Sequence, residues 1–280
     1  MQLSYRIVNV FTVSGGRLTG NPLCVFEDGS SLTDAEMQAL ALQFNLSETS
    51  FIMPSSQADA RVRIFSPGYE MPFAGHPTLG TAQVVNDLRG LAGRVSLELN
   101  VGVIPVAKDG DLWELQARPA TTRVPKASPT ALATALGLQP TDLAGTPLWV
   151  NNGNEQLIVP LKDADAVRRA RAPHDELSRV TDDGPRPNAY LFAKTGDRTL
   201  QSRFFFSQKG TMIEDPATGS ATANLGGFYL ANGATTPLTL DIRQGEMTGR
   251  PSALRLRIDA SRNVFVAGEV IELGRGYVNA

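Results

Sequence analysis

Two similar octets, far apart in the 280-residue sequence, constrain the fold more than any other feature. The first is GHPTLGTA at 75–82, and the second is EDPATGSA at 214–221. Laid side by side without a gap, they share proline, glycine, hydroxyl and alanine positions. Each follows a strand-like segment with arginine and aromatic residues, RIF at 63–65 and RFFF at 203–206. The order of elements agrees along most of both halves, which predicts a duplicated unit and two similar lobes.

Within each half, strand-like segments outnumber helical ones, and most connections are too short for βαβ crossovers. The sequence therefore predicts an α+β fold of two pseudo-symmetric lobes, each a mixed or antiparallel β-sheet or barrel wrapped around a central helix. The central helices are expected at LGTAQVVNDL and ATANLGGFYL, which are rich in small and aliphatic residues. We expect an N-terminal lobe over residues 1–118 and a C-terminal lobe over 119–280, and the last strands could pack on either lobe.

Two further helices and one crossing segment are predicted from local patterns. Thr33 and Glu36 form a capping-box pattern, and apolar residues at helical spacing follow as far as Phe44. A helical stretch is expected in the second half from about Asp163 to Val180. Prolines and threonines interrupt any regular pattern at 117–129, so this segment is expected to join the lobes.

Composition excludes several classes of protein and site. A formal charge of -2 and a pI near 5.8 make nucleic acid a poor partner. The first residues, MQLSYRIVNVFTV, read as a strand and not as an export signal, which argues against a membrane association. Cys24 is the single cysteine and cannot form an internal disulfide, so we expect a cytoplasmic protein. The two histidines, His76 and His174, are not spaced as a ligand pair, and no metal site is expected.

The residues at the two octets suggest a site for a small acid. His76 and Asp215 each precede a proline, which we expect at the first position of a helix. If a pseudo-twofold axis relates the halves, both helix starts face one cleft and place His76 opposite Asp215. Backbone N–H groups around Gly75 and Gly219, with Ser220, could then bind a carboxylate. Taken alone, Asp215 could equally be a helix cap, and His76 a core histidine.

Glu48 makes the two halves different. It lies in NLSE between the first helix and the next strands, whereas the second half offers only DDG at 182–184. A single base that serves one face of a substrate can remove a proton and return it to another carbon, which is an isomerisation. Two alternatives remain open. His76 and Asp215 could act as opposed bases of an amino-acid or hydroxy-acid epimerase, or the cleft could bind a small carboxylate without catalysis.

Five segments together resemble the phenazine-biosynthesis isomerase (PhzF-like) family. They are GNPLCVF, NLSETSFI, RIFSPGYEMPFAGHPTLGTA, EDPATGSATANL and QGEMTGRPS. The resemblance spans most of the chain and implies a diaminopimelate-epimerase-like fold. Diaminopimelate epimerases carry a cysteine at each helix start, and this sequence has neither.

The resemblance also implies roles for individual residues. Glu48 would be the general acid/base, and His76, Asp215 and Ser220 would hold the substrate and assist. We place Asn21, Gly75, Gly219 and Ser220 among the substrate-binding residues. The family further implies a small-molecule carboxylate substrate, a homodimer and no cofactor.

Overall fold

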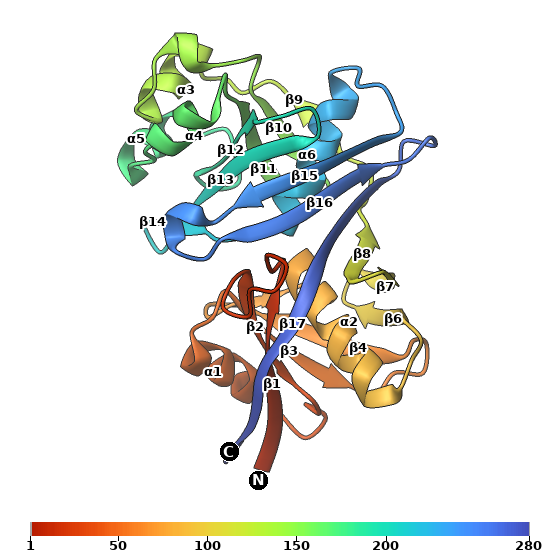
Figure 1. The fold of residues 1–280 in the computed structure, drawn as a ribbon. Coiled ribbons are helices and arrows are strands. Elements are labelled where there is room, and N and C mark those ends of the chain that lie inside the picture. The colour runs from red at the N-terminus through yellow and green to blue at the C-terminus, as the bar shows by residue number, and fades with distance from the viewer. Residues whose placement is uncertain (1, 280) are drawn as a thin grey trace. The chain divides into compact units, whose positions relative to one another are not determined.

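The computed structural model describes residues 2–279, which form two compact units (Figure 1). The N-terminal lobe comprises residues 2–116 and 267–279, and the C-terminal lobe comprises residues 117–266. The sequence left the last strands open between the lobes. In the structure, residues 267–279 join the N-terminal lobe because they pair antiparallel with its first strand, from Gln2 opposite Asn279 to Val10 opposite Val270.

The N-terminal lobe is a mixed sheet with two helices. Its elements are β1 (Gln2–Val10), β2 (Asn21–Phe26), α1 (Asp34–Phe44), β3 (Glu48–Met53), β4 (Ala60–Phe65), β5 (Glu70–Met71), α2 (Gly75–Arg89), β6 (Arg94–Leu99), β7 (Gly102–Asp109) and β8 (Leu112–Gln116), with most of β17 (Val264–Asn279). Strands β2 and β3 are parallel and flank α1 in sequence, and β4 and β6 are parallel and flank α2. The other pairings, β1 with β2, β3 with β4, β4 with β5, β6 with β7 and β7 with β8, are antiparallel.

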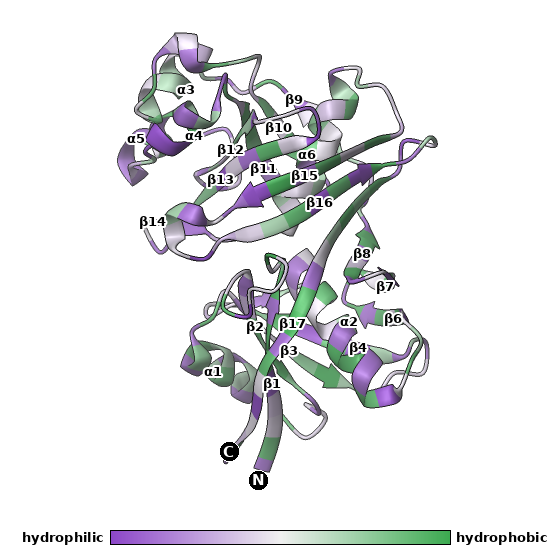
Figure 2. Ribbon diagram, in the orientation of Figure 1, coloured by the Kyte–Doolittle hydropathy of each residue, from purple (hydrophilic) through white to green (hydrophobic). Residues whose placement is uncertain are grey.

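Helix α1 confirms the predicted capping box. The Thr33 side chain accepts a hydrogen bond from the Glu36 backbone N–H, and the Glu36 carboxylate accepts one from the Thr33 backbone N–H. The helix ends at Asn45, which has a left-handed conformation. Met37 and Ala41 are its buried residues, and α1 shows both hydrophobic and hydrophilic colours in Figure 2. Helix α1 covers one side of the sheet. It leads the chain directly into β3, whose first residue is Glu48.

Helix α2 is the buried centre of the N-terminal lobe. All residues from Gly75 to Ala82 are buried, and the helix packs against β1, β2, β3, β4, β6 and β8. The packing is so close that a Cβ on Gly80 would lie 2.6 Å from Cδ2 of Leu23 in β2. A side chain at position 80 would therefore push α2 away from the sheet.

The C-terminal lobe has the same kind of architecture. Its elements are β9 (Thr121–Arg123), α3 (Pro129–Ala135), η1 (Pro140–Asp142), β10 (Leu148–Asn151), β11 (Glu155–Pro160), α4 (Ala164–Arg169), α5 (His174–Val180), β12 (Asn188–Lys194), β13 (Thr199–Gln208), β14 (Thr211–Asp215), α6 (Gly219–Ala231), β15 (Leu238–Gln244), η2 (Glu246–Thr248) and β16 (Ser252–Ile258). Helix α6 is its buried centre and packs against β9, β10, β11 and β16.

One local prediction in this lobe is wrong, and one segment contains more regular structure than expected. The helix expected over 163–180 is two short helices, α4 and α5, because the chain turns extended at Ala170 and Pro173 precedes the second helix. The crossing segment at 117–129 contains a strand, β9, which pairs antiparallel with β10.

The order of strand pairings confirms the predicted duplication. In the C-terminal lobe β11 and β12 are parallel, β12 and β13 antiparallel, β13 and β14 a hairpin, and β13 and β15 parallel across α6. Most elements of the N-terminal lobe thus have a counterpart in the C-terminal lobe: β1 corresponds to β10, β2 to β11, β3 to β12, β4 to β13, β5 to β14, α2 to α6, β6 to β15 and β7 to β16. The α+β fold of two similar lobes, each a mixed sheet around a central helix, is therefore the observed one.

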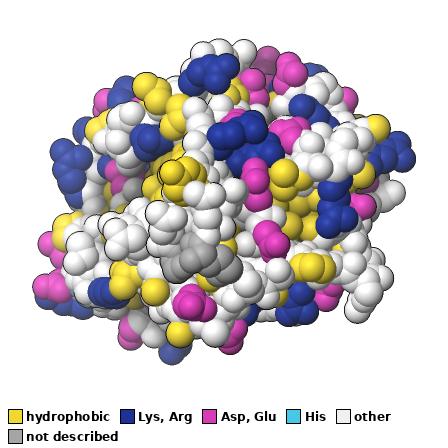
Figure 3. Space-filling view, turned by 90° about the horizontal axis from the view of Figure 1, so that it is seen from below, with side chains coloured by type: hydrophobic (Ala, Val, Ile, Leu, Met, Phe, Trp, Pro, Cys, Tyr) yellow, Lys and Arg dark blue, Asp and Glu magenta, His cyan; other side chains and the backbone are white. Residues whose placement is uncertain are grey.

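The surface has no single sign of charge on the face drawn in Figure 3, where basic and acidic side chains are interspersed. Within residues 2–279, no helix is both long enough and apolar enough to cross a membrane.

Candidate active site

Glu48 and His76 form a close pair inside the N-terminal lobe. Glu48 is the first residue of β3, and His76 is the second residue of α2. Nδ1 of His76 lies 2.9 Å from Oε2 of Glu48, and the two side chains are 5% and 18% exposed. His76 is thus shielded from bulk water and Glu48 is largely shielded, which strengthens their interaction.

The second ring nitrogen of His76, Nε2, takes no part in the contact with Glu48. With an ionised Glu48, which can only accept, Nδ1 carries the ring proton and a neutral imidazole presents its lone pair at Nε2. Nε2 is buried and has no hydrogen-bond partner among the described residues. A buried polar atom without a partner is costly, and its position at a helix start suggests that a bound molecule supplies the partner.

The start of α2 adds backbone donors. The residue before the helix is Ala74, whose side chain cannot cap it, and the first intrahelical bond runs from Thr78 N–H to the Ala74 carbonyl. The N–H groups of Gly75 and His76 therefore lack intrahelical partners, and the third helical residue, Pro77, has none to offer. Such a helix start favours an anion.

Asp215 is held by its neighbours at the end of β14. The Thr218 hydroxyl donates to Oδ2 of Asp215, and the Gln244 side chain donates to the Asp215 carbonyl at 2.9 Å and to the Thr218 hydroxyl oxygen at 3.0 Å. Gln244 and Thr218 are both buried. The alternative reading of Asp215 as a helix cap is wrong, because α6 begins four residues later and Thr218 occupies the cap position.

Ser220 is the second residue of α6, directly after the buried Gly219. Its hydroxyl oxygen accepts a hydrogen bond from Nε2 of Gln156 at 2.9 Å. The cap residue, Thr218, makes no side-chain hydrogen bond to the helix, so the first N–H groups of α6 have neither a side-chain cap nor intrahelical partners, as in α2.

The structure corrects the alignment of the two octets. Arg63 pairs through two hydrogen bonds with Glu70 in β5, and Arg203 pairs in the same way with Glu214 in β14. Both glutamates lie five residues before the glycine that starts the helix, so EMPFAGH at 70–76 matches EDPATGS at 214–220.

This match changes the equivalent residues. Ser220 is the counterpart of His76, and Asp215 is the counterpart of Met71. The prolines that coincide are Pro72 and Pro216, which both precede the helices, so neither octet has proline at the first helical position. The predicted equivalence of His76 and Asp215 is wrong because it matched the wrong pair of prolines.

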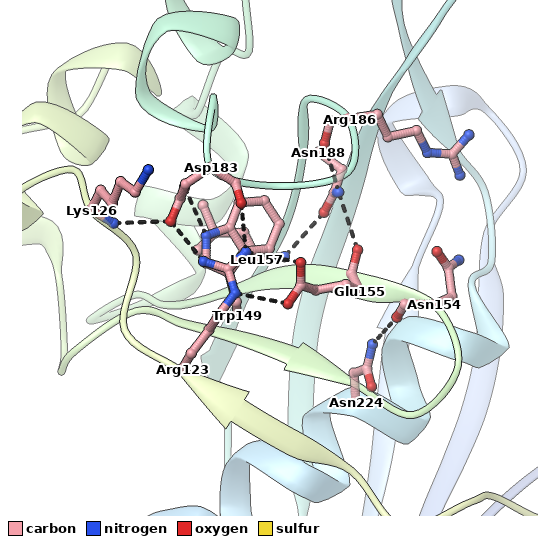
Figure 4. A network of polar contacts seen from close by, with 10 residues as sticks. All are labelled: Arg123, Lys126, Trp149, Asn154, Glu155, Leu157, Asp183, Arg186, Asn188 and Asn224. Carbon is pink, nitrogen blue, oxygen red and sulfur yellow. Dashed lines mark hydrogen bonds and ion pairs between the residues drawn. The ribbon is translucent and has the colours of Figure 1, made fainter.

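Asn188 is the counterpart of Glu48. Thr49 faces Phe65 across β3 and β4, and Ala189 faces Phe205 across β12 and β13, which makes the preceding residues equivalent. Oδ1 of Asn188 accepts from the Leu157 N–H at 3.0 Å, and its amide donates to the carbonyls of Arg186 and Glu155 (Figure 4). The acid of one lobe is thus replaced in the other by an amide that makes its hydrogen bonds with backbone groups.

Asn21 begins β2 and is buried, and its counterpart is Asn154 before β11. The repeated Gly-Asn dipeptides at 20–21 and 153–154 were the sequence signal for this equivalence. Sequence reasoning missed the buried polar residues Gln156, Asn188, Asn224 and Gln244, since only the strand register shows what they contact.

Cys24 takes no part in these groups. It lies in β2 within a hydrophobic cluster, and burial raises the pKa of its thiol. Within residues 2–279, no group of three or more His, Cys, Asp or Glu side chains is arranged to hold a metal ion.

A buried helix in each lobe and an acid paired with an imidazole at one helix start fit a protein of the isomerase and epimerase type, and the comparisons with known proteins agree. A family model of phenazine biosynthesis-like proteins matches residues 8–275. The chain is 35% identical over 277 residues to an uncharacterised isomerase of Pasteurella multocida, covering 98% of this chain and 93% of the relative. It is 34% identical over 281 residues to the trans-2,3-dihydro-3-hydroxyanthranilate isomerase of Pseudomonas aeruginosa, covering 98% and 97%.

The fold is similar to the crystal structure of a phenazine biosynthesis protein of the PhzF family from Bacillus anthracis. The TM-score is 0.87 at 24% identity, with full coverage of both chains. The chain therefore belongs to the phenazine biosynthesis-like (PhzF) family and is an isomerase, which confirms the resemblance seen in the sequence.

Proposed function

We propose that this isomerase moves a proton between two carbons of a small carboxylated, cyclic or unsaturated substrate by general acid/base catalysis, without a cofactor. The observation that carries the proposal is the buried contact between Glu48 and His76. Glu48 removes a proton from one carbon, the electron pair shifts along the adjacent unsaturated system, and the same carboxyl group returns the proton to another carbon. Atoms and electrons balance without an oxidant or reductant.

His76 supports this step in two ways. Its Nδ1–H hydrogen bond orients the Glu48 carboxylate, and its Nε2 accepts a hydrogen bond from an N–H or O–H of the substrate. The free N–H groups of Gly75 and His76 bind a substrate carboxylate. We also propose Asn21 in the N-terminal lobe, and Asp215, Gly219 and Ser220 in the C-terminal lobe, as substrate-binding residues.

The difference between the lobes favours isomerisation over inversion. Inversion at one carbon needs an acid or base on each face, whereas Asn188, the counterpart of Glu48, has no titratable group. The identity to trans-2,3-dihydro-3-hydroxyanthranilate isomerase suggests that compound as the first substrate to test.

The test is proton exchange in heavy water with trans-2,3-dihydro-3-hydroxyanthranilate, followed by NMR. The Glu48 side chain is 18% exposed, so we expect its carboxyl proton to exchange with heavy water before the carboxyl group protonates the second carbon. Native protein should then place deuterium at the carbon that gains the proton, and Glu48→Gln should lose this labelling while it still binds 2-aminobenzoate in calorimetry. Glu176→Gln, on the exposed side of α5, is the matched control and should label normally.

Three results would contradict the proposal. Undiminished labelling in Glu48→Gln would remove the role of this residue. Loss of optical activity at one centre of an amino or hydroxy acid, dependent on His76 and Asp215, would favour the epimerase alternative. Binding of carboxylates without exchange in any substrate would favour a binding protein.

A further inference from the structure

A chain of three side chains ends at the Ser220 hydroxyl. Nδ2 of Asn224 donates to the Asn154 carbonyl at 2.7 Å and to Oε1 of Gln156 at 2.8 Å. Nε2 of Gln156 then donates to Oγ of Ser220 at 2.9 Å. Gln156 is 1% exposed and Asn224 is fully buried.

The backbone carbonyl of Asn154 fixes the direction of this chain (Figure 4). A carbonyl can only accept, so the Asn224 amide must present its NH₂ group there and to Gln156. The oxygen of Gln156 therefore faces Asn224, and its NH₂ group faces Ser220. No flip of either amide is compatible with all three contacts.

Ser220 consequently acts as an acceptor inside the protein and keeps its proton for another partner. Among the described residues its hydroxyl makes no second hydrogen bond. Ser220 is half-buried at the start of α6, beside N–H groups that lack intrahelical partners. The hydroxyl proton and these N–H groups form one set of donors.

We propose that Gln156 and Asn224 are positioning residues that hold the Ser220 hydroxyl as a hydrogen-bond donor to the substrate carboxylate. The inference rests on the proposed function, because it assumes that Ser220 contacts the substrate. It adds that two buried amides, which themselves touch no substrate, set the polarity of that contact.

The N-terminal lobe shows that the fold does not need these amides. Continuing the strand registers, Leu23 in β2 is the counterpart of Gln156, and Gly80 in α2 is the counterpart of Asn224. The same place in the architecture is therefore apolar in one lobe and amide-lined in the other. Buried amides cost free energy unless they are fully paired. These two amides occur beside Ser220 and not at the equivalent place in the N-terminal lobe, which indicates a role at Ser220.

The neighbouring residues hold Gln156 in place. Arg123 donates two hydrogen bonds to Glu155, the residue before Gln156, and further ones to the side chain and carbonyl of Asp183 (Figure 4). Asp183 also accepts from Nε1 of Trp149 in the adjacent strand β10. This network fixes the start of β11.

The experiment reverses the direction of the hydrogen bond between residue 156 and Ser220 without removing the contact. In Gln156→Glu, an ionised carboxylate can still accept from Asn224 but must take the proton of Ser220. At pH 8 we expect kcat/KM and 2-aminobenzoate affinity to fall about tenfold to a hundredfold, the loss for one hydrogen bond to a charged group. Ser220→Ala should show the same loss, and the double variant should show no more than either single one.

A pH profile distinguishes an effect of the Ser220 hydrogen-bond direction from a general disruption of the structure. A protonated carboxyl group at position 156 can donate to Ser220 as the amide does, so the loss in Gln156→Glu should shrink relative to native protein as the pH falls from 8 to 5. Gln57→Glu is the control, because Gln57 is exposed and its replacement makes the same change of charge at the protein surface. It should match native protein at each pH.

Asn224→Asp tests the same chain from its other end, and serves if Gln156→Glu does not fold. An aspartate cannot donate to Gln156, so the Gln156 amide turns and Ser220 must donate to it. Native affinity in either inverted variant, or losses that add to that of Ser220→Ala, would overturn the inference. An unaffected Ser220→Ala would overturn it too, and the Glu48 experiment would still decide the proposed function.

Discussion

Ser220 occupies in the C-terminal lobe the position that His76 occupies in the N-terminal lobe, each being the second residue of the central helix. Both side chains are contacted from a neighbouring strand, His76 by Glu48 of β3 and Ser220 by Gln156 of β11. The duplicated fold thus presents an acid and an imidazole at one helix start, and a hydroxyl with an amide at the other.

Replacing Asn188 by aspartate should not create a second base. The carboxylate would keep the contact to Leu157 N–H but face two carbonyl oxygens, those of Arg186 and Glu155. We expect the free energy of unfolding to fall by about 1 to 3 kcal/mol in urea titrations, without epimerase activity. Asn232→Asp, at the exposed end of α6, is the control and should cost less. A gain of inversion at one carbon would contradict this prediction.

The two equivalent arginine pairs should contribute unequally to stability. Arg203 is 7% exposed and, besides Glu214, donates to three carbonyls at the end of α4, whereas Arg63 is 14% exposed and its further partner is the exposed Asp34. Arg203→Gln should lower the free energy of unfolding by about 3 to 5 kcal/mol, as expected when one partner of a buried pair is removed.

Arg63→Gln is the matched variant and should cost about 1 to 3 kcal/mol, since the charge left behind is closer to water. Urea unfolding of both variants, monitored by circular dichroism, measures the difference. Equal losses would show that the additional helix contacts of Arg203 add nothing.

Gly245→Ala should disturb the segment that holds Asp215. Gly245 has φ of +83°, and an added Cβ would overlap the carbonyl oxygens of Arg250 and Pro216. Gly249 in the same loop has φ of +72° with open space around it. Gly249→Ala should cost about 1 to 2 kcal/mol from its backbone conformation alone, and Gly245→Ala about 1 to 3 kcal/mol more from the overlap.

The same pair of variants should separate in activity. Gln244, next to Gly245, donates to the Asp215 carbonyl, so a shift of this loop reaches Asp215. We expect kcat/KM to fall in Gly245→Ala and to stay near native in Gly249→Ala. Thermal unfolding and turnover measured on the same samples test both statements.

Asp142 should stabilise the C-terminal lobe at neutral pH but not in strong acid. Hydrogen bonds from Lys162 and from the Gln139 N–H, with Arg169 beside them, lower the pKa of this buried carboxyl from 3.8 to about 2. The unfolded chain therefore takes up the proton first as the pH falls. The stabilisation is complete above about pH 4 and disappears towards pH 2.

Asp142→Asn should accordingly unfold at lower urea concentration than native protein at pH 7. We expect its free energy of unfolding to be lower by about 1 to 2 kcal/mol. The difference should narrow at pH 3. Asp109→Asn, on the exposed part of β7, is the control with the same change of charge. A gap that stays constant between pH 7 and pH 3 would show that the charge of Asp142 is not its source.

Local sequence patterns predicted much of the fold. The capping box at Thr33, the α+β class, the two lobes and their buried central helices all follow from spacing and composition. The pattern over 163–180 failed because Pro173 divides it, and β9 was missed because a strand of three residues leaves no periodicity to detect. The final strand was ambiguous because only its pairing with β1 shows where it belongs.

The site was predictable as a set of residues but not as a set of contacts. Glu48 and His76 were selected from their motifs, and the structure brings them together. The octets were paired incorrectly because two prolines matched by chance. Of the arginine and glutamate residues that fix the true register, only Glu214 lies within an octet. Gln156 and Asn188 look like ordinary strand residues until their neighbours are known.

The contact between Gly80 and Leu23 shows how far the two halves have diverged. Where Gly80 lets α2 approach an aliphatic side chain, α6 carries Asn224 against Gln156. Neither central helix could be transplanted into the other lobe, because α2 would leave Gln156 without an amide partner and α6 would force a polar side chain onto leucine. Each central helix is therefore fitted to the sheet of its own lobe.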